Sequence, residues 1–479
     1  MTTPSSDTAL PAPARLSWTV HAYQELNRAT PGQEAARGQK FNAFLANLLR
    51  LGGLHDAVSD QRGLNGRDEI DVFFTLGYTP YIVEAKWTTK PTDADALLKI
   101  EGRLKTRPSG TRAVLISMSG YTRHALDLAQ SHADVLLLDR AHVEAMTAGL
   151  ITAEALFHAV LSLASRRGGS YVPLTDLLDP PTPRDPLPTL RPASRGVEHF
   201  PALPEPDVTV TGVLTSDGPW TAGEVNGVAA AADGSLLWTV MDGVLSTDSS
   251  GVTGWTAAPA LCRGPALAAD GSTFVLSAEA ALRLGQSQAH VVGGGFTGAH
   301  WLMPGPDKSA WVFSTTGPQT TRGYGGHILT RLGDTLADST AHGVPFDGQV
   351  HQAALTPTGT LYLASGGHSV TTNADQGLAC PTTNWVRSAP LTPTAALAIG
   401  DHTVLLAGPT GTGIEKALYA VDTRNHQAVP LLRLPNTTRI TGLAGAGQDA
   451  VHLLTDIRGN DQTPRPFLLH VTIPAPARP

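Results

Sequence analysis

The sequence is poor in cysteine and has no long hydrophobic run. Only Cys262 and Cys380 occur among 479 residues, with no CxxC pair and no His/Cys spacing that would hold zinc. Nowhere do about 18 apolar residues follow one another, and residues 1–20 have no basic start followed by an apolar stretch. These absences argue against a disulfide scaffold, a zinc domain and a membrane helix. They predict a cytoplasmic protein with no membrane partner.

The first third of the chain also lacks an excess of charge of either sign. The formal net charge of the whole is -7, yet residues 30–170 hold 16 Lys+Arg against 15 Asp+Glu, a balance of +1. The acidic excess therefore lies mainly C-terminal to this region. An acidic chain is not expected to coat nucleic acid without specificity, but a local basic face in the first third could still contact phosphates.

Two textures divide the chain, which is longer than one hydrophobic core usually organises. Residues 33–177 alternate helix-like patterns with short apolar strands, whereas residues 207–479 are rich in Gly, Thr and Ala and contain many short strands. Residues 178–206 are expected to be a semi-rigid linker, because dense prolines prevent helix continuation and sheet pairing. Residues 1–32 would be an N-terminal extension. The linker prolines are Pro180, Pro181, Pro183, Pro186, Pro188 and Pro192.

The first domain is predicted to be an α/β sheet with helices on its faces. Apolar residues between Phe41 and Leu49 recur at helical spacing, and Gly52-Gly53 closes that helix. A strand-helix-strand unit later in the domain predicts parallel pairing. In chain order the remaining expected elements are strands at 70–76 and 81–87, a helix at 94–107, a strand at 113–117, a helix at 121–131 and a strand at 135–139.

The C-terminal texture repeats. Asp233-Gly234-Ser235, Asp270-Gly271-Ser272 and Asp307-Lys308-Ser309 each precede a short apolar strand, and their spacing is 37 residues (233, 270, 307). Weaker copies of this pattern begin near residues 358, 400 and 448, and small-residue strands precede most copies. Six such units predict an all-β propeller of about six blades, since small residues let inner strands crowd around an axis. A pair of irregular β-sandwiches is the alternative.

Three charged residues in the first domain are candidates for chemistry. If Gly77-Tyr78 forms a type II′ hairpin turn, Leu76 pairs with Thr79, and the register places Asp71 opposite Glu84. Opposed side chains lie about 4.5 to 5.5 Å apart at Cβ, close enough for both carboxylates to hold one cation. Lys86 would lie on the same face as Glu84.

This trio suits hydrolysis of a phosphodiester. Facing carboxylates repel unless a cation neutralises them, and hard oxygen ligands select Mg²⁺ or Mn²⁺. Such an ion lowers the pKa of a bound water, and a lysine ammonium can steer that water or stabilise the developing charge. The trio by itself is a weak signal, because charged residues on an ordinary solvated hairpin would look the same.

The surrounding sequence resembles the Mrr-like type IV restriction endonuclease domains of the PD-(D/E)XK superfamily. The resemblance covers residues 33–177 and is carried by residues 37–38, 69–71, 81–87, 100–104, 111–121 and 135–139. It implies a metal-dependent DNA endonuclease with Asp71 and Glu84 as metal-binding acids and Lys86 as the catalytic lysine. Many members carry a further acid on the first helix; here Gln39, Lys40 and Asn42 stand there, with Glu34 near the start.

The resemblance also suggests partners. Lys90, Lys99, Arg103 and Lys105 follow the catalytic strand and are candidate contacts to DNA phosphates, with solvated surface charge as the equal alternative. The predicted function is restriction or phage defence, in which the propeller recognises or senses an unknown ligand or protein. A homodimer would supply the two active sites that duplex cleavage needs. The alternative is a non-catalytic DNA- or protein-binding scaffold with a degenerate nuclease fold.

Other reactive residues in the propeller form no pattern. His300, His351 and His368 lie at blade positions without fixed spacing and are expected to be solvated or hydrogen-bonded. A propeller hydrolase or lactonase would need carboxylates around the central channel, and the expected inner strands show none clearly.

Overall fold

The computed structural model divides the chain into two compact units, one formed mainly by Met1–Asp179 and the other by most of the remaining residues. No helix in the described part of either unit is both long enough and apolar enough to cross a membrane. The described residues are 12–28, 34–62, 69–132, 134–178, 190–192, 203–204, 208–216, 225–231, 233–240, 243–248, 251–257, 262–268, 270–285, 289–296, 300–306, 309–315, 319–320, 323–324, 327–344, 349–373, 386–435, 437–446, 449–458 and 464–473.

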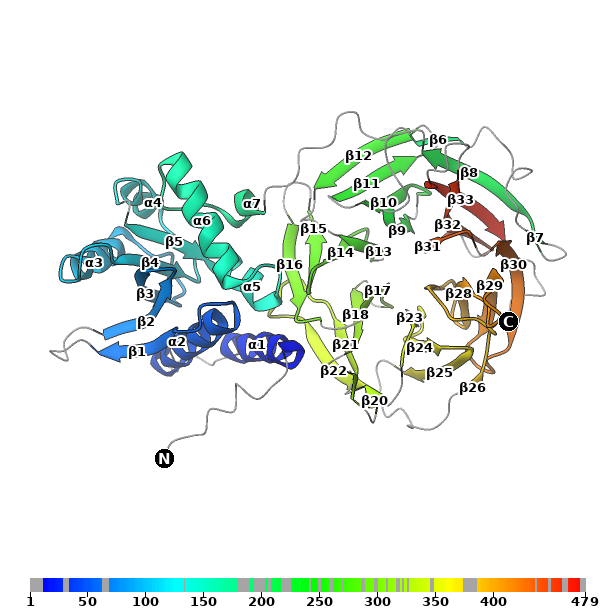
Figure 1. The fold of residues 1–479 in the computed structure, drawn as a ribbon, viewed down its shortest axis with the longest axis horizontal. Helices are drawn as coiled ribbons and strands as arrows, with labels where there is room; N and C mark the ends of the chain where they lie inside the picture. Colours follow the sequence, from blue (N-terminus) through cyan, green and yellow to red (C-terminus); the bar gives the residue numbers. More distant parts are fainter. Residues whose placement is uncertain are drawn as a thin grey trace. The chain divides into compact units, whose positions relative to one another are not determined.

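Unit 1 is built on a five-stranded mixed sheet in the order β1-β2-β3-β4-β5 (Figure 1). The first three strands pair antiparallel, and β3, β4 and β5 pair parallel. The strand-helix-strand pattern predicted the parallel pairing of β4 with β5. Strand β1 was not expected from the sequence. The strands are β1 (Val58–Arg62), β2 (Glu69–Leu76), β3 (Thr79–Lys86), β4 (Arg112–Ser117) and β5 (Val135–Asp139).

Helices cover both faces of this sheet (Figure 1). On one face, Leu97 and Ile100 of α3 pack with Ile82 and Leu115 in a buried cluster that also takes in α4. On the other face, the Phe157 ring of α6 lies 4.8 Å from that of Phe74. The helices are α1 (Ala12–Asn27), α2 (Glu34–Leu51), α3 (Ala94–Leu104), α4 (Arg123–Ala129), α5 (Arg140–Ala148), α6 (Ala153–Arg167) and α7 (Leu174–Leu177).

A glycine pair ends α2 where the sequence predicted its end. Gly53 has a φ of 106°, which only glycine adopts readily. A Cβ at Gly52 would lie 2.5 Å from the backbone nitrogen of Ala153, the first residue of α6. The pair therefore both stops α2 and lets the start of α6 approach it closely.

Unit 2 is a six-bladed β-propeller, as the repeats predicted (Figure 1). Each blade is an antiparallel sheet whose first strand is innermost. The blades are β9 (Val225–Ala230), β10 (Leu236–Val240), β11 (Gly243–Asp248) and β12 (Gly251–Ala257); β13 (Arg263–Leu267), β14 (Thr273–Ser277), β15 (Ala280–Leu284) and β16 (Ala289–Gly294); β17 (His300–Pro304), β18 (Ala310–Thr315), β21 (His327–Arg331) and β22 (Thr340–Val344); β23 (Gln352–Leu355), β24 (Thr360–Ser365), β25 (His368–Asn373) and β26 (Val386–Arg387); β27 (Ala395–Ala398), β28 (Thr403–Pro409), β29 (Glu415–Asp422) and β30 (Ala428–Pro435); β31 (Ile440–Gly445), β32 (Ala450–Arg458) and β33 (Pro464–Thr472).

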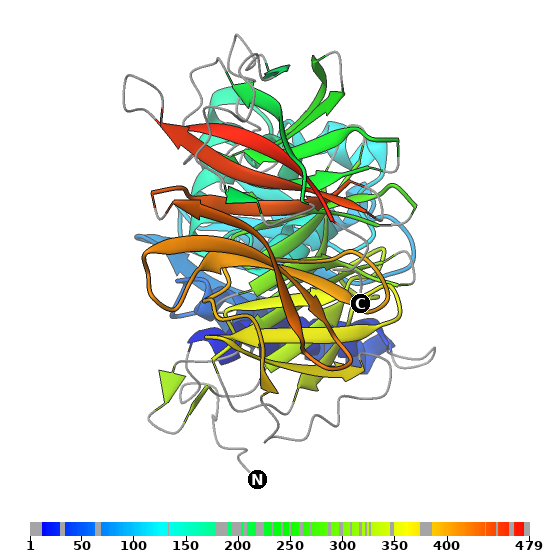
Figure 2. The same ribbon diagram turned by 90° about the vertical axis from the view of Figure 1, so that its right-hand side faces the viewer.

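The last blade is completed by an earlier part of the chain. Strand β8 (Val210–Ser216) pairs antiparallel with β33, so the green segment lies beside the red one (Figures 1 and 2). Strand β6 (Leu190–Pro192) extends this sheet, and β7 (Leu203–Pro204) extends the sheet of β30. Both short strands fall in the segment expected to be a linker, and of its prolines only Pro192 and Pro204 lie among the described residues. One further hairpin joins β19 (Gln319–Thr320) and β20 (Gly323–Tyr324).

The Asp-Gly-Ser repeats form the turns between first and second strands. Asp233 Oδ1 accepts a hydrogen bond of 2.9 Å from the backbone nitrogen of Ser235, and Asp270 Oδ1 accepts one of 2.8 Å from that of Ser272. The glycines between them have φ values of 84° and 83°. An aspartate that caps its own turn and a glycine at positive φ are what such a tight turn requires. The third copy, Asp307-Lys308, lies outside the described residues.

Candidate active site

The β2–β3 hairpin has the register that the sequence predicted. Leu76 pairs with Thr79 and Val72 with Val83. Gly77 has a φ of 59°, while the described non-glycine residues with positive φ do not include Tyr78. A positive φ at the first turn residue alone is the type II′ pattern.

The paired ladder ends one step before the two candidate acids. Val72↔Val83 is its last pair, and in the same register Asp71 and Glu84 come next. Instead of continuing the backbone ladder, Asp71 accepts a hydrogen bond of 2.8 Å at Oδ2 from the backbone nitrogen of Ala85. The side chain of Asp71 is thereby held against β3, beside Glu84. The acids lie where the two strands stop pairing.

Two cations meet the Glu84 carboxylate, one at each oxygen. Lys86 Nζ lies 2.5 Å from Oε1, and Arg103 Nη1 of α3 donates to Oε2. Glu84 is only 13% exposed, and Lys86 and Arg103 are 38% and 29% exposed. The ion pairs are therefore partly desolvated, which strengthens them relative to surface pairs.

Arg103 belongs to this cluster more closely than the sequence suggested. We expected it among residues that contact phosphates, yet it pairs with Glu84 from the last turn of α3. Its place follows from the packing of α3 on the sheet face that carries Ile82 and Glu84. Alternation along β3 gives the face, but the approach of the helix is a tertiary contact that no local pattern reveals.

The electrostatics of Asp71 fit a pair of acids that share a cation. Burial raises the pKa of Asp71, and the charge of Glu84 raises it further. The Ala85 hydrogen bond and the charges of Lys86 and Arg103 act in the opposite direction. A further positive charge close to both carboxylates would relieve the cost of holding Asp71 ionised.

The donor set suits a hard divalent cation that keeps several waters. Asp71 and Glu84 are adjacent carboxylates, and Mg²⁺ commonly uses one or two carboxylates, completing its shell with water and substrate oxygens. Within the described residues, no group of three or more His, Cys, Asp or Glu side chains is placed to hold a metal. Asn42 of α2, which stands where an additional acid was considered, donates a hydrogen bond of 3.0 Å to Asp60. The side chain of Glu34 lies outside the described residues.

Trp87, directly after Lys86, is held in place by residues of α1, α2 and α5. Arg37 Nη2 donates a hydrogen bond of 3.1 Å to the Trp87 carbonyl oxygen. The guanidinium groups of Arg37 and Arg140 lie 5.5 and 5.8 Å from the centre of the Trp87 ring, within range for cation–π attraction. The Tyr23 ring stacks on it at 5.9 Å. These contacts fix the end of β3, from which Glu84 and Lys86 project.

Comparison with protein families identifies the domain that carries this site. Residues 34–147 match the model of the Mrr-type restriction endonuclease family. Unit 1 contains a restriction endonuclease domain. The matched residues include the hairpin with Asp71, Glu84 and Lys86, and also Arg103. The match over residues 34–147 confirms the resemblance inferred from the sequence.

No curated protein matches the chain, and solved structures resemble it weakly. A gluconolactonase from Xanthomonas campestris is 17% identical, with 60% of this chain and 99% of that one covered and a TM-score of 0.41. A soluble aldose sugar dehydrogenase from Escherichia coli is 11% identical, with 56% and 100% covered and a TM-score of 0.33. Likeness at this level assigns neither ligand nor activity to unit 2.

The other basic residues expected near the restriction endonuclease site are exposed. Lys90 and Lys99 face solvent, and Lys105, at 74% exposure, forms an ion pair of 3.4 Å with Glu101. Of the four candidate phosphate contacts, the structure brings Arg103 to the acidic pair and places these three on the surface.

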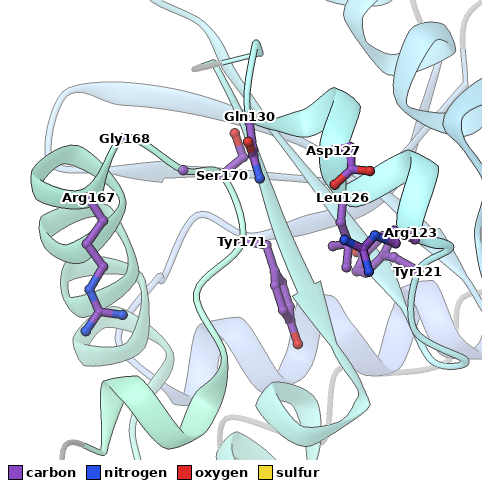
Figure 3. A pocket seen from close by; sticks show the side chains of 10 residues that line it. Tyr121, Arg123, Leu126, Asp127, Gln130, Arg167, Gly168, Ser170 and Tyr171 are labelled. Carbon is purple, nitrogen blue, oxygen red and sulfur yellow. The ribbon is translucent and has the colours of Figure 1, made fainter.

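A pocket of about 690 Å³ in the same domain lies apart from the acidic pair (Figure 3). Figure 3 shows Tyr121 and Arg123 on one side, Arg167 on the other and Tyr171 between them. Tyr171 donates a hydrogen bond of 2.7 Å to Asp139, and Arg167 pairs with Asp176. Tyr171 and Arg167 are thus engaged in contacts within the fold, and none of the three candidate catalytic residues lines the pocket.

Proposed function

We propose that unit 1 is a Mg²⁺- or Mn²⁺-dependent endodeoxyribonuclease of restriction or phage defence, acting in the cytoplasm. The observation that carries the proposal is the meeting of Asp71, Glu84 and Lys86 at the point where β2 and β3 stop pairing, inside a restriction endonuclease domain. A chance arrangement of charges on a solvated hairpin would not have Glu84 at 13% exposure between two cations.

Asp71 and Glu84 are the residues that would hold the metal ion. Their oxygens lie on neighbouring strands, and the Ala85 backbone nitrogen orients Asp71. When bound, the ion polarises a phosphodiester oxygen and lowers the pKa of a water molecule. The rigid attachment of both acids to a sheet keeps the ligand geometry defined, which loop residues would do less well.

Lys86 supplies the positive charge that the reaction needs beside the acids. Its ammonium group has three donors, and only one contact, to Glu84 Oε1, is needed to position it. The remaining donors can orient the attacking water and stabilise charge on the phosphate oxygens as the P–O bond breaks. Arg103 acts as a positioning residue, because its guanidinium fixes the second oxygen of Glu84.

The substrate would be held by exposed cations around this site. Lys90, Lys99 and Lys105 are exposed and lie close in sequence to the catalytic strand and α3, so their ammonium groups are accessible to DNA phosphates. In this proposal the propeller recognises or senses a ligand or protein partner, and a homodimer supplies the second cut in duplex DNA.

The experiment compares the wild-type chain with Lys86→Ala, Asp71→Asn and, as a control, Arg166→Ala, which changes an exposed residue of α6. Each purified protein is incubated with Mg²⁺ and methylated or unmethylated plasmid, and with a single-stranded RNA of similar length. We expect nicking of plasmid by the wild type and by Arg166→Ala, and about a thousandfold slower nicking by the other two. Equal rates for all four would contradict the assignment.

Absence of cleavage on every substrate would instead favour a degenerate nuclease fold that binds without cutting. Gel-shift measurements with the same proteins separate that outcome from loss of the DNA interaction. Cleavage confined to RNA would keep the catalytic residues and overturn the assignment of DNA as substrate.

A further inference from the structure

The propeller of unit 2 encloses a channel of about 520 Å³ along its inner strands. Those strands neighbour one another in the closed order β9-β13-β17-β23-β27-β31. Within one residue of the start of each, one polar side chain lines the channel, so each blade contributes one. These six are Asn226, Arg263, His300, Gln352, Thr394 and Thr441.

The six polar residues share one mouth of the channel. Each inner strand begins there and pairs antiparallel with the end of its neighbour, as in Arg263↔Leu276, His300↔Ser314 and Gln352↔Ala364. Farther along each strand the lining residues are uncharged and apolar, mainly Ala, Leu and Gly. The channel therefore has a polar ring at one end and an uncharged interior.

Arg263 is the only charged side chain among the described residues that line the channel. It is exposed, and its Nη2 donates a hydrogen bond of 3.2 Å to His300 Nε2 of the next blade. No ion pair of Arg263 occurs in the part of the chain that the structure describes. Since one guanidinium carries five N–H donors, most of its capacity remains for a ligand.

Two amides of the same polar ring are held in fixed orientations. Asn226 donates a hydrogen bond of 3.4 Å to the Cys262 carbonyl oxygen, and Gln352 donates one of 2.8 Å to the Thr394 carbonyl oxygen. Their contacts tie adjacent blades together at the mouth. They also hold the amide groups in place around the channel entrance, so that ligand binding need not order them.

One carboxyl group acts on Arg263 from outside the channel. Glu279, in the turn between β14 and β15, has an Oε2 atom that is buried and has no hydrogen-bond partner in the described part of the chain. Burial raises the pKa of Glu279, and the charge of Arg263 lowers it. Glu279 does not line the channel, so it would weaken the binding of an anion to Arg263 through charge repulsion alone.

We propose that this mouth binds a small organic anion, with its carboxylate or phosphate group on Arg263 and its uncharged remainder in the channel. A guanidinium pairs with either group through two parallel hydrogen bonds, and an uncharged channel offers no competing site for a cation. No Asp or Glu lies among the described lining residues, so a divalent metal or a cationic ligand has no counter-charge there.

The test is isothermal titration of the full chain with five probes of simple chemistry. These are hexanoate, hexyl phosphate, acetate, 1-hexanol and hexylammonium. We expect the two six-carbon anions to bind, acetate to bind about tenfold more weakly than hexanoate, and the alcohol and the ammonium not to bind measurably. Hexanoate against hexyl phosphate shows which acid group the site prefers.

Two variants with opposite expected effects keep the test independent of folding. Arg263→Gln is expected to weaken hexanoate binding at least tenfold, and Glu279→Gln to strengthen it, because one removes the positive charge and the other a nearby negative charge. Arg387→Gln, on the exposed outer strand β26, is the matched control. Unchanged melting temperatures without probe show that each variant is folded.

The proposal is overturned if hexanol binds as tightly as hexanoate, or if Arg263→Gln and Arg387→Gln bind alike. Equal affinity for acetate and hexanoate would overturn the placement of the uncharged part in the channel. Binding of a short DNA duplex, blocked by Arg263→Gln, with no response to any small anion, would replace the small-molecule site with a macromolecular one.

Discussion

Unit 1 and unit 2 distribute their polar side chains in different ways. In the restriction endonuclease domain, two acids and two cations converge on one point of one sheet face, and each occurs once. In the propeller, one polar side chain per blade stands at the same mouth, and only Arg263 among those described is charged. A catalytic constellation needs unlike groups at one place, whereas repetition yields like positions around an axis.

The difference teaches where each unit is sensitive to change. Substitution of one of the two acids or two cations in the unit 1 cluster removes a group that no other residue of the cluster replaces. Exchange of one polar residue in the ring of unit 2 leaves five others, unless that residue is the one with charge. The substitutions below test this contrast by measuring stability, nicking activity and the pH dependence of stability.

The largest expected effect concerns the core of unit 1. Phe157 is fully buried, and its ring lies 4.8 Å from Phe74 and 6.2 Å from Tyr81. Phe157→Ala should lower the free energy of unfolding of unit 1 by about 3–5 kcal/mol, because it removes the ring and leaves a cavity. Urea denaturation followed by circular dichroism and limited proteolysis should show one transition move and the propeller transition stay. A joint shift of both transitions would mean that the units do not unfold separately.

A smaller effect is expected from the cation that positions Glu84. Arg103→Gln should slow plasmid nicking about 100-fold, which corresponds to about 2.7 kcal/mol, since Glu84 loses the contact at Oε2. The loss should fall on kcat more than on KM, and Arg103→Lys should restore part of it. Lys105→Gln, two residues further on and 74% exposed, is the control. If both Gln variants raise KM equally and leave kcat unchanged, Arg103 acts as a phosphate contact only.

The smallest effect concerns pH and the propeller. Burial, with His470 beside it, lowers the pKa of His452 from 6.5 to about 4. Between these values the unfolded chain binds the proton and the folded chain does not. The stabilisation linked to neutral His452 is therefore fully present above about pH 6.5 and is lost as the pH falls toward 4. Between pH 7.5 and 5.0 we expect a loss of roughly 1–2 kcal/mol, allowing for partial exposure.

His452→Leu tests the source of that pH dependence. In this variant the urea midpoint of the propeller transition should change less between pH 7.5 and 5.0 than it does in the wild type. His368→Leu, an exposed histidine of β25, should leave the dependence as it is in the wild type. A slope that both variants share with the wild type would assign it to other groups.

The hairpin of unit 1 was predictable because its determinants are local. Gly77 sets the turn, the turn sets the register, and the register brings Asp71 to Glu84. The blades were predictable for the same reason, since an aspartate and a glycine recur at each turn between first and second strands. In both cases the information lies within about fifteen residues along the chain.

Contacts between distant segments were not predictable from the sequence. The role of Arg103 depends on how α3 packs on the sheet, and the support of Trp87 comes from α1, α2 and α5. Strand β1 consists mostly of polar, exposed residues, so its sequence carries no periodic pattern of apolar residues. The polar ring of the propeller became visible only when six inner strands were brought around one axis.

Strand β8 imposes an order on biosynthesis. Its partner β33 follows it by about 250 residues, so the ring cannot close before the ribosome has made β33. Until then β8 presents an unpaired edge, which is the kind of surface that recruits other chains. The nuclease segment, translated earlier, has all five strands of its sheet in hand by Asp139. During translation, the sheet that carries Asp71 and Glu84 is therefore complete before the ring of blades can close.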